Sequence, residues 1–387
     1  MKTFIESLRG IYAKEQWLFF YALNVLFIWK YMSRTAYHPL IGTAVFTVIF
    51  LMTVPLFQYI SKKGEKTVIT VLVMLLAVST LLIAALLYKV DRMELRVDRW
   101  SATTYFLDGL FSGIYPYGIH THVCETNFPS PSPMWFYLNI PFWLMGDVGI
   151  GLICYLFLLV WLVWWFTRSK VRTLLYTMLL LISPAYWWEV AVRSDSISNA
   201  IVIFGIILFF EKKAFSFQRH WIATAVICGL MAVTRLWAPI PPAIYLARSF
   251  FSVSHARKAA VIAIILLVMF IVFAPYIFWD TDTWVFFHRN PYMSETSTGN
   301  GWILLVMIAI ALFLAFRYRD FNEYCRYTSC FLTLFFVASL FYNHIAHNAD
   351  ISYFEDSDFD ISYLSLMLPY CLYVLSLHPH TCCPKES

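Results

Sequence analysis

Apolar runs close to the length of a membrane-spanning helix, each bounded by charged or turn-forming residues, recur along this chain. An α-helix needs about 20 such residues to cross the hydrocarbon core of a bilayer. Only 13% of the 387 residues are charged, about half the share typical of a soluble domain. We therefore predict an all-α, polytopic transmembrane helical bundle whose solvent is the lipid bilayer.

The apolar runs predict about 11 to 13 spans in a single integral membrane domain over residues 1–387, because no repeat or low-complexity linker divides the chain. A further apolar stretch, 134–146, is either a re-entrant or interfacial helix or one more span. The twelve runs interpreted as spans are 16–33, 38–60, 67–88, 148–167, 173–188, 197–210, 220–236, 238–250, 259–279, 301–316, 327–346 and 362–377.

The distribution of charge predicts the orientation. With the N-terminus cytoplasmic, the inner segments carry 19 of the 28 basic residues and the outer segments carry 16 of the 23 acidic ones. Positive charge retained on the cytoplasmic side is the usual pattern of membrane insertion. We expect both termini in the cytoplasm, no cleaved signal peptide, and the longest outer segment at 89–147.

The outer segment 89–147 is long and rich in proline and aromatic residues, which favours an enzyme that acts on the non-cytoplasmic face. An amphipathic helix is predicted from Asp98 to near Gly113. A carboxylate at the start of that helix, where the chain leaves the membrane, can face a wet, partly apolar cleft and act as a general base. The alternative is that Asp98 only caps the helix, where aspartate is favoured.

This segment contains Asp98-Arg99-Trp100, Tyr105, Leu110, Gly113, Tyr115-Pro116-Tyr117, Pro129-Ser130-Pro131-Ser132-Pro133 and Pro141. In this pattern it resembles the bacterial GT-C superfamily of mannosyltransferase-like glycosyltransferases. In that superfamily an aspartate in the first large external loop begins a juxtamembrane helix, and a Gly-x-x-Pro-Tyr turn and a Tyr-Pro-Pro segment follow. Here 128–131 replaces Tyr-Pro-Pro, and the loop follows the third predicted span rather than the first.

The resemblance implies a hexosyltransferase of the plasma (inner) membrane, acting in envelope polysaccharide or glycolipid assembly. It would move a sugar, with inversion, from a polyprenyl-phosphate-linked donor to a hydroxyl of a glycan or glycolipid acceptor. Asp98 matches the catalytic aspartate and would be the general base. A cation would stabilise the departing lipid phosphate. No cofactor is indicated, although a divalent metal stays open, and no nucleic-acid-binding signature is present.

Several residues are candidates for binding the donor phosphate or the sugar. Arginine suits phosphate because its planar fork donates two parallel hydrogen bonds. Arg235 lies in an apolar stretch of a predicted span, so it either serves function or snorkels to the headgroups. Arg193 and Asp195 either bind substrate or pair with each other to order their loop. The remaining candidates are Arg99, Tyr105 and Tyr117 in the outer segment, with His288 and Arg289, which alternatively belong to an ordinary wet loop.

Three further clusters contain residue types that bind metals. His120, His122, Cys124 and Glu125 lie close together, but no second half-site accompanies them, so the zinc signal is weak. The acidic run 355–360 is interpreted as a solvated loop, with a divalent cation as the alternative. The tail 378–383 is interpreted as unstructured, with metal binding or palmitoylation as the alternatives.

Two other functions compete with the transferase. A polysaccharide polymerase of the envelope pathway would also carry large outer loops with arginines, but it would use an oligosaccharide repeat as donor. A membrane transporter is less favoured, because the sequence has no inverted repeat and no paired, glycine-broken spans.

Overall fold

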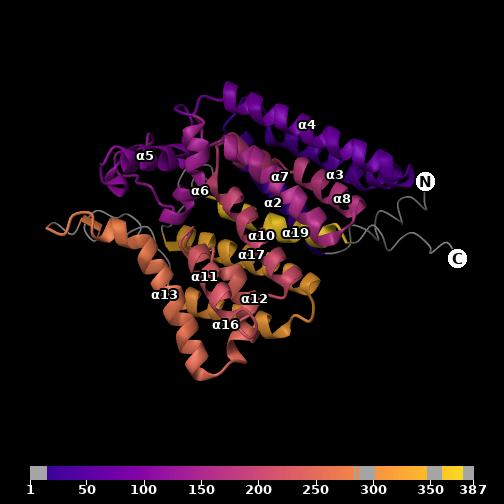
Figure 1. The fold of residues 1–387 in the computed structure, drawn as a ribbon. Coiled ribbons are helices and arrows are strands. Elements are labelled where there is room, and N and C mark those ends of the chain that lie inside the picture. The colour runs from indigo at the N-terminus through magenta and orange to yellow at the C-terminus, as the bar shows by residue number, and fades with distance from the viewer. Residues whose placement is uncertain (1–14, 283–284, 287–300, 347–359, 378–387) are drawn as a thin grey trace. The chain divides into compact units, whose positions relative to one another are not determined.

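The computed structural model describes residues 15–282, 285–286, 301–346 and 360–377, in which all regular structure is helical (Figure 1). The elements are α2 (Glu15–Met32), α3 (Pro39–Lys62), α4 (Glu65–Lys89), α5 (Arg99–Phe111), η1 (Pro116–Gly118), α6 (Pro133–Leu144), α7 (Ile150–Thr167), α8 (Lys170–Leu181), α9 (Pro184–Ala191), α10 (Asp195–Lys213), α11 (Trp221–Ala232), α12 (Ile240–Phe251), α13 (His255–Ile277), α16 (Gly301–Arg317), α17 (Phe321–Ala346), η3 (Ser362–Met367) and α19 (Leu368–Leu375).

Every apolar run that predicts a span contains a helix, and the apolar stretch 134–146 contains α6. By length and composition five helices, α3, α4, α7, α13 and α17, can cross a membrane. The pair α8 and α9, bent by 66° at a short break, makes a sixth if it is one span. An all-helical structure with several helices able to cross a membrane is thus confirmed for the described residues. The count of 11 to 13 spans and the orientation stay predictions.

Contacts between residues divide the chain into two compact units, the first formed by 1–83, 156–189 and 319–387 and the second by 84–155 and 190–318. Compactness alone does not show that either unit folds by itself, so the single membrane domain stays a prediction. The elements of each unit come from distant parts of the sequence.

In the first unit α19 packs against α2, α8 and α17, and α3 packs against α2 and α8. The fully buried Asn24 of α2 joins this core to the start of α9. Its side-chain oxygen accepts from the hydroxyl of Ser183 at 2.6 Å and from the backbone N–H of Ala185 at 3.1 Å. A buried amide is tolerated here because its hydrogen-bonding groups are satisfied.

In the second unit α11 packs along α13, α12 packs along α16, and α5 packs against η1 and α6 (Figure 1). Aromatic rings form the core between α5, α6 and α13. Phe106 stacks on Phe136 with ring centroids 3.5 Å apart, and Tyr276 contacts Phe106 at 5.5 Å. Buried aromatic rings of this size contribute strongly to stability, so this core holds α5 and its first residue in place.

Candidate functional site

Asp98 lies immediately before α5, but its side chain makes no capping hydrogen bond. Its backbone, at φ −85° and ψ 4°, is not in the extended conformation from which a capping side chain reaches the helix N–H groups. The carbonyl of Asp98 starts the helix instead, by accepting from the N–H of Ala102 at 2.8 Å. The alternative that Asp98 only caps the helix is therefore contradicted, and its carboxyl group needs another explanation.

The surroundings of Asp98 raise the pKa of its carboxyl group. Burial is the largest cause, because it disfavours the charged form. The positive charge of Arg99 opposes this effect, the carboxylate of Asp195 adds to it, and Arg235 opposes it more weakly. Asp98 therefore lies within electrostatic reach of all three residues. A carboxylate with a raised pKa is a better proton acceptor near neutral pH than an ordinary one.

Arg99, Asp195 and Arg235 form a buried ion cluster, which we call the arginine–aspartate centre. Each of the three residues is only 4–8% exposed to solvent. Nη1 of Arg99 lies 3.4 Å from Oδ1 of Asp195 and 2.5 Å from the hydroxyl of Ser196. The guanidinium of Arg235 binds Oδ2 of the same carboxylate. One aspartate thus binds two arginines.

Arg235 lies in the turn that follows α11, because the helix ends at Ala232. Its predicted position inside a spanning helix is therefore wrong, and so is the alternative of snorkelling, because the guanidinium is buried against Asp195. The segment before α6 holds the turn: the N–H of Ser132 donates to the carbonyl of Thr234 at 3.2 Å. Nη1 of Arg235 also donates to the hydroxyl of Ser130 at 3.3 Å.

Asp195 is the first residue of α10, and the helix begins there because Ser194 caps it. The hydroxyl of Ser194 accepts from the N–H of Ser196. A negative charge in the first turn is also favoured by the helix dipole. The hydrophobic pattern does not predict Ser130 or Ser196 as part of this site. The run of cap-forming residues 194–196 is the signal that would have pointed to Ser196.

Arg193 does not pair with Asp195, which corrects that part of the prediction. Its Nε lies 3.2 Å from a carboxylate oxygen of Asp147. Its Nη2 donates to the backbone carbonyls of Leu87, at 2.7 Å, and Val90, at 3.4 Å, at the end of α4. A cation that satisfies terminal carbonyls caps a helix C-terminus. Arg193 therefore supports α4 rather than a ligand.

Replacing Arg193 by lysine is expected to lower the free energy of unfolding by about 1–3 kcal/mol, because one ammonium group cannot reproduce the fork that binds both Asp147 and the carbonyls. Thermal unfolding of the purified protein in detergent measures the loss. The turnover of the folded fraction should match that of the wild type. A loss of turnover without a change in the unfolding midpoint would show that Arg193 acts in catalysis or substrate binding.

The two tyrosines predicted to bind substrate lie in different surroundings. Tyr117 is fully buried and its hydroxyl donates to the carbonyl of Pro131 at 3.1 Å, so it packs the loop, and a role in binding substrate stays a prediction. Tyr105 is partly exposed, with its ring edge-on to Trp100 at 5.8 Å between centroids. Its role in binding stays a prediction.

The remaining predicted residues either lie outside the described part of the chain or belong to the predicted metal clusters. His288, Arg289, the tail 378–383 and the acidic run up to 359 lie outside the described residues. Of the cluster His120, His122, Cys124 and Glu125, His122 is engaged in hydrogen bonds to protein atoms. Within the described part of the chain, no three His, Cys, Asp or Glu side chains gather closely enough to hold a metal ion.

Comparisons of the chain with protein-family models, with curated proteins and with solved structures find no match. The function is therefore inferred from the residues of the site and from the resemblance of the outer segment.

Proposed function

We propose that the chain is a membrane glycosyltransferase of the GT-C type, which moves a sugar from a polyprenyl-phosphate-linked donor to an acceptor hydroxyl outside the cytoplasm. The observation that supports this most is that Asp98 lies close enough to the arginine–aspartate centre for its charges to act on the carboxyl group. A carboxyl group that makes no capping bond, with a raised pKa, lies within electrostatic reach of two buried arginines. Inverting transfer needs one base and one cation, and these residue types supply both.

In the proposed reaction the carboxylate of Asp98 accepts the proton of the acceptor hydroxyl. The hydroxyl oxygen then attacks the anomeric carbon, and the bond from that carbon to the lipid phosphate oxygen breaks on the opposite face. The phosphate leaves with the electron pair of that bond, so the configuration of the sugar is inverted. Arg235 and Arg99 stabilise the charge that develops on the phosphate.

The balance of charge supports this assignment. When Asp98 is ionised, the two carboxylates of Asp98 and Asp195 neutralise the two guanidinium groups of Arg99 and Arg235. When Asp98 takes the proton, one net positive charge remains among the four groups. That charge arises in the same step in which the phosphate becomes more negative. The stabilisation is therefore greater in the transition state than in the ground state, which is what accelerates a reaction.

A transfer assay tests the proposal. The purified protein in liposomes is given polyprenyl-phosphate donors that carry labelled mannose or glucose, together with glycolipid acceptors. We expect one sugar added per acceptor, with inverted configuration, measured by chromatography and NMR of the product. A ladder of products from an oligosaccharide-linked donor would indicate the polymerase instead. Counterflow of a solute without any transfer would indicate the transporter.

A further inference from the structure

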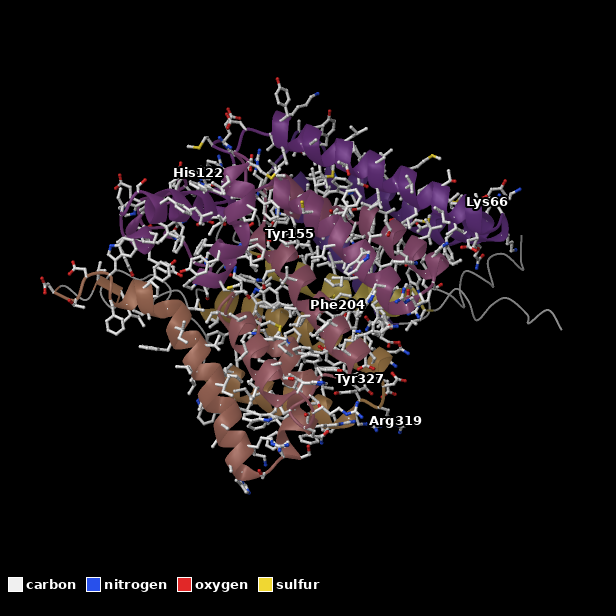
Figure 2. All side chains as sticks on the ribbon, in the orientation of Figure 1. Lys66, His122, Tyr155, Phe204, Arg319 and Tyr327 are labelled. Carbon is white, nitrogen blue, oxygen red and sulfur yellow. The ribbon has the colours of Figure 1, made fainter. Side chains whose placement is uncertain are left out.

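His122, which Figure 2 labels, lies in the loop that follows η1. It makes hydrogen bonds on both sides of Asp98 along the chain. Its Nε2 lies 2.9 Å from the carbonyl oxygen of Leu95, three residues before Asp98. Its Nδ1 lies 2.6 Å from the hydroxyl oxygen of Ser101, three residues after Asp98. The backbone N–H of His122 also donates to that hydroxyl at 3.3 Å. One residue thus joins the segment before α5 to the first turn of α5.

The partners of the imidazole determine where its proton lies. A carbonyl oxygen only accepts, so Nε2 carries the hydrogen and donates it to Leu95. The hydroxyl of Ser101 has one hydrogen, which it donates either to Nδ1 or to the backbone carbonyl oxygen of Asp98, 3.1 Å away. Ser101 is fully buried, so little water competes for its bond.

The ring of Trp100 packs against the imidazole, and Arg92 packs in turn on Trp100. The ring of Trp100 packs edge-on against His122, with ring centroids 6.4 Å apart. The guanidinium of Arg92 lies over the ring of Trp100, 4.2 Å from its centroid. A cation over a tryptophan ring is a favourable contact, so the wall against which His122 packs is itself supported.

We propose that His122 is a positioning residue for Asp98, acting through Leu95 and Ser101. This inference rests on the proposed function. Because the side chain of Asp98 makes no capping bond, the direction of its carboxyl group depends on the backbone on either side of it. His122 fixes that backbone at both ends of the turn. A base displaced by about 1 Å loses about 10²-fold in rate, so the effect of the bridge is on catalysis.

The test compares Ser101→Ala, His122→Ala and the double variant in the transfer assay. We expect each change to lower kcat by about 10- to 100-fold, as for other supporting residues, while KM changes little. Because both residues act through one bridge, the double variant should lose no more than the more severe single variant. His122→Gln keeps a donor and an acceptor, so it should recover part of kcat.

The pH profile supplies a readout that a purely structural role would not move. When the bridge is lost, the carboxyl group of Asp98 gains contact with water, so its pKa falls. The acid limb of the kcat profile should therefore shift to lower pH in Ser101→Ala and His122→Ala. The control is His120→Ala, because His120 is exposed and contacts the ring of Phe128 rather than Ser101. That variant should keep the wild-type kcat and profile.

The outcomes separate the two proposals. If Asp98→Asn is inactive while Ser101→Ala and His122→Ala keep the wild-type kcat, the positioning role is wrong and the transferase assignment stands. If the variants lose kcat only in proportion to their loss of folded protein, measured by thermal unfolding, His122 is structural and the inference is overturned. Full activity in Asp98→Asn would show that Asp98 is not the base, and it would overturn the positioning role of His122 as well.

Discussion

Replacing Asp98 by asparagine is expected to lower the rate of sugar transfer by about 10²- to 10⁴-fold, the usual contribution of a general base. Asparagine keeps the shape of the side chain but cannot take the proton of the acceptor hydroxyl. Because the side chain of Asp98 makes no capping hydrogen bond, the substitution should leave the start of α5 unchanged. Single-turnover transfer from the labelled donor measures the rate, and size-exclusion chromatography verifies the fold.

The matched control is Asp108→Asn, on the same helix. Asp108 is exposed, and its carboxylate accepts a hydrogen bond from the indole N–H of Trp143 at 2.8 Å. Asparagine retains an oxygen that can accept this bond, so the rate should equal that of the wild type. Equal rates in Asp98→Asn and Asp108→Asn would remove Asp98 from the mechanism. Equal losses would point to a general effect of charge on the outer segment.

The raised pKa of Asp98 allows a second test of the same prediction, through the pH dependence of the transfer rate. The base works only when it is ionised, so the rate should fall as the pH drops through its pKa. Because burial raises that pKa, the acid limb should lie above the value of about 3.9 for an ordinary aspartate. The residual rate of Asp98→Asn should no longer decrease in this pH range. A decrease that persists would report the titration of another group.

The positions of the helices follow from the sequence because each apolar run has a charged or turn-forming boundary. The start of α5 beside Asp98 is predictable for the same reason, since an amphipathic pattern begins there. The arginine–aspartate centre is not predictable in this way. Arg99 and Asp195 are 96 residues apart, and Asp195 and Arg235 are 40 apart, so no spacing along one helix brings them together. Their pairing depends on how the second unit packs.

Arg193 shows why a local interpretation of charge fails. It lies two residues before Asp195, and such closeness suggests a pair. Side chains two residues apart do not face each other at a helix start. Arg193 also adopts a left-handed backbone with φ 52°, which turns its side chain away from α10. The carbonyls that it satisfies belong to α4, more than 100 residues earlier. An unsatisfied helix end is not visible in a hydrophobic pattern.

Replacing Asp195 by alanine is expected to cause the largest loss of stability, about 3–5 kcal/mol, the usual cost of removing one partner from a buried ion pair. The change leaves the guanidinium groups of Arg99 and Arg235 buried, close together and without the carboxylate that both bind. The yield of monodisperse protein and the midpoint of thermal unfolding should both fall. An unchanged midpoint would mean that water already screens the two arginines.

A compensated variant separates the stability of this centre from its chemistry. Combining Asp195→Ala with Arg99→Met and Arg235→Leu removes the two guanidinium charges together with the carboxylate that both bind, and apolar replacements of a buried ion cluster are often neutral or stabilising. We expect this triple variant to recover most of the lost stability but to transfer no sugar, because no cation remains to stabilise the leaving phosphate. A triple variant that is both stable and active would show that the centre serves only the fold. A triple variant as unstable as Asp195→Ala would show that shape, rather than charge, accounts for the loss.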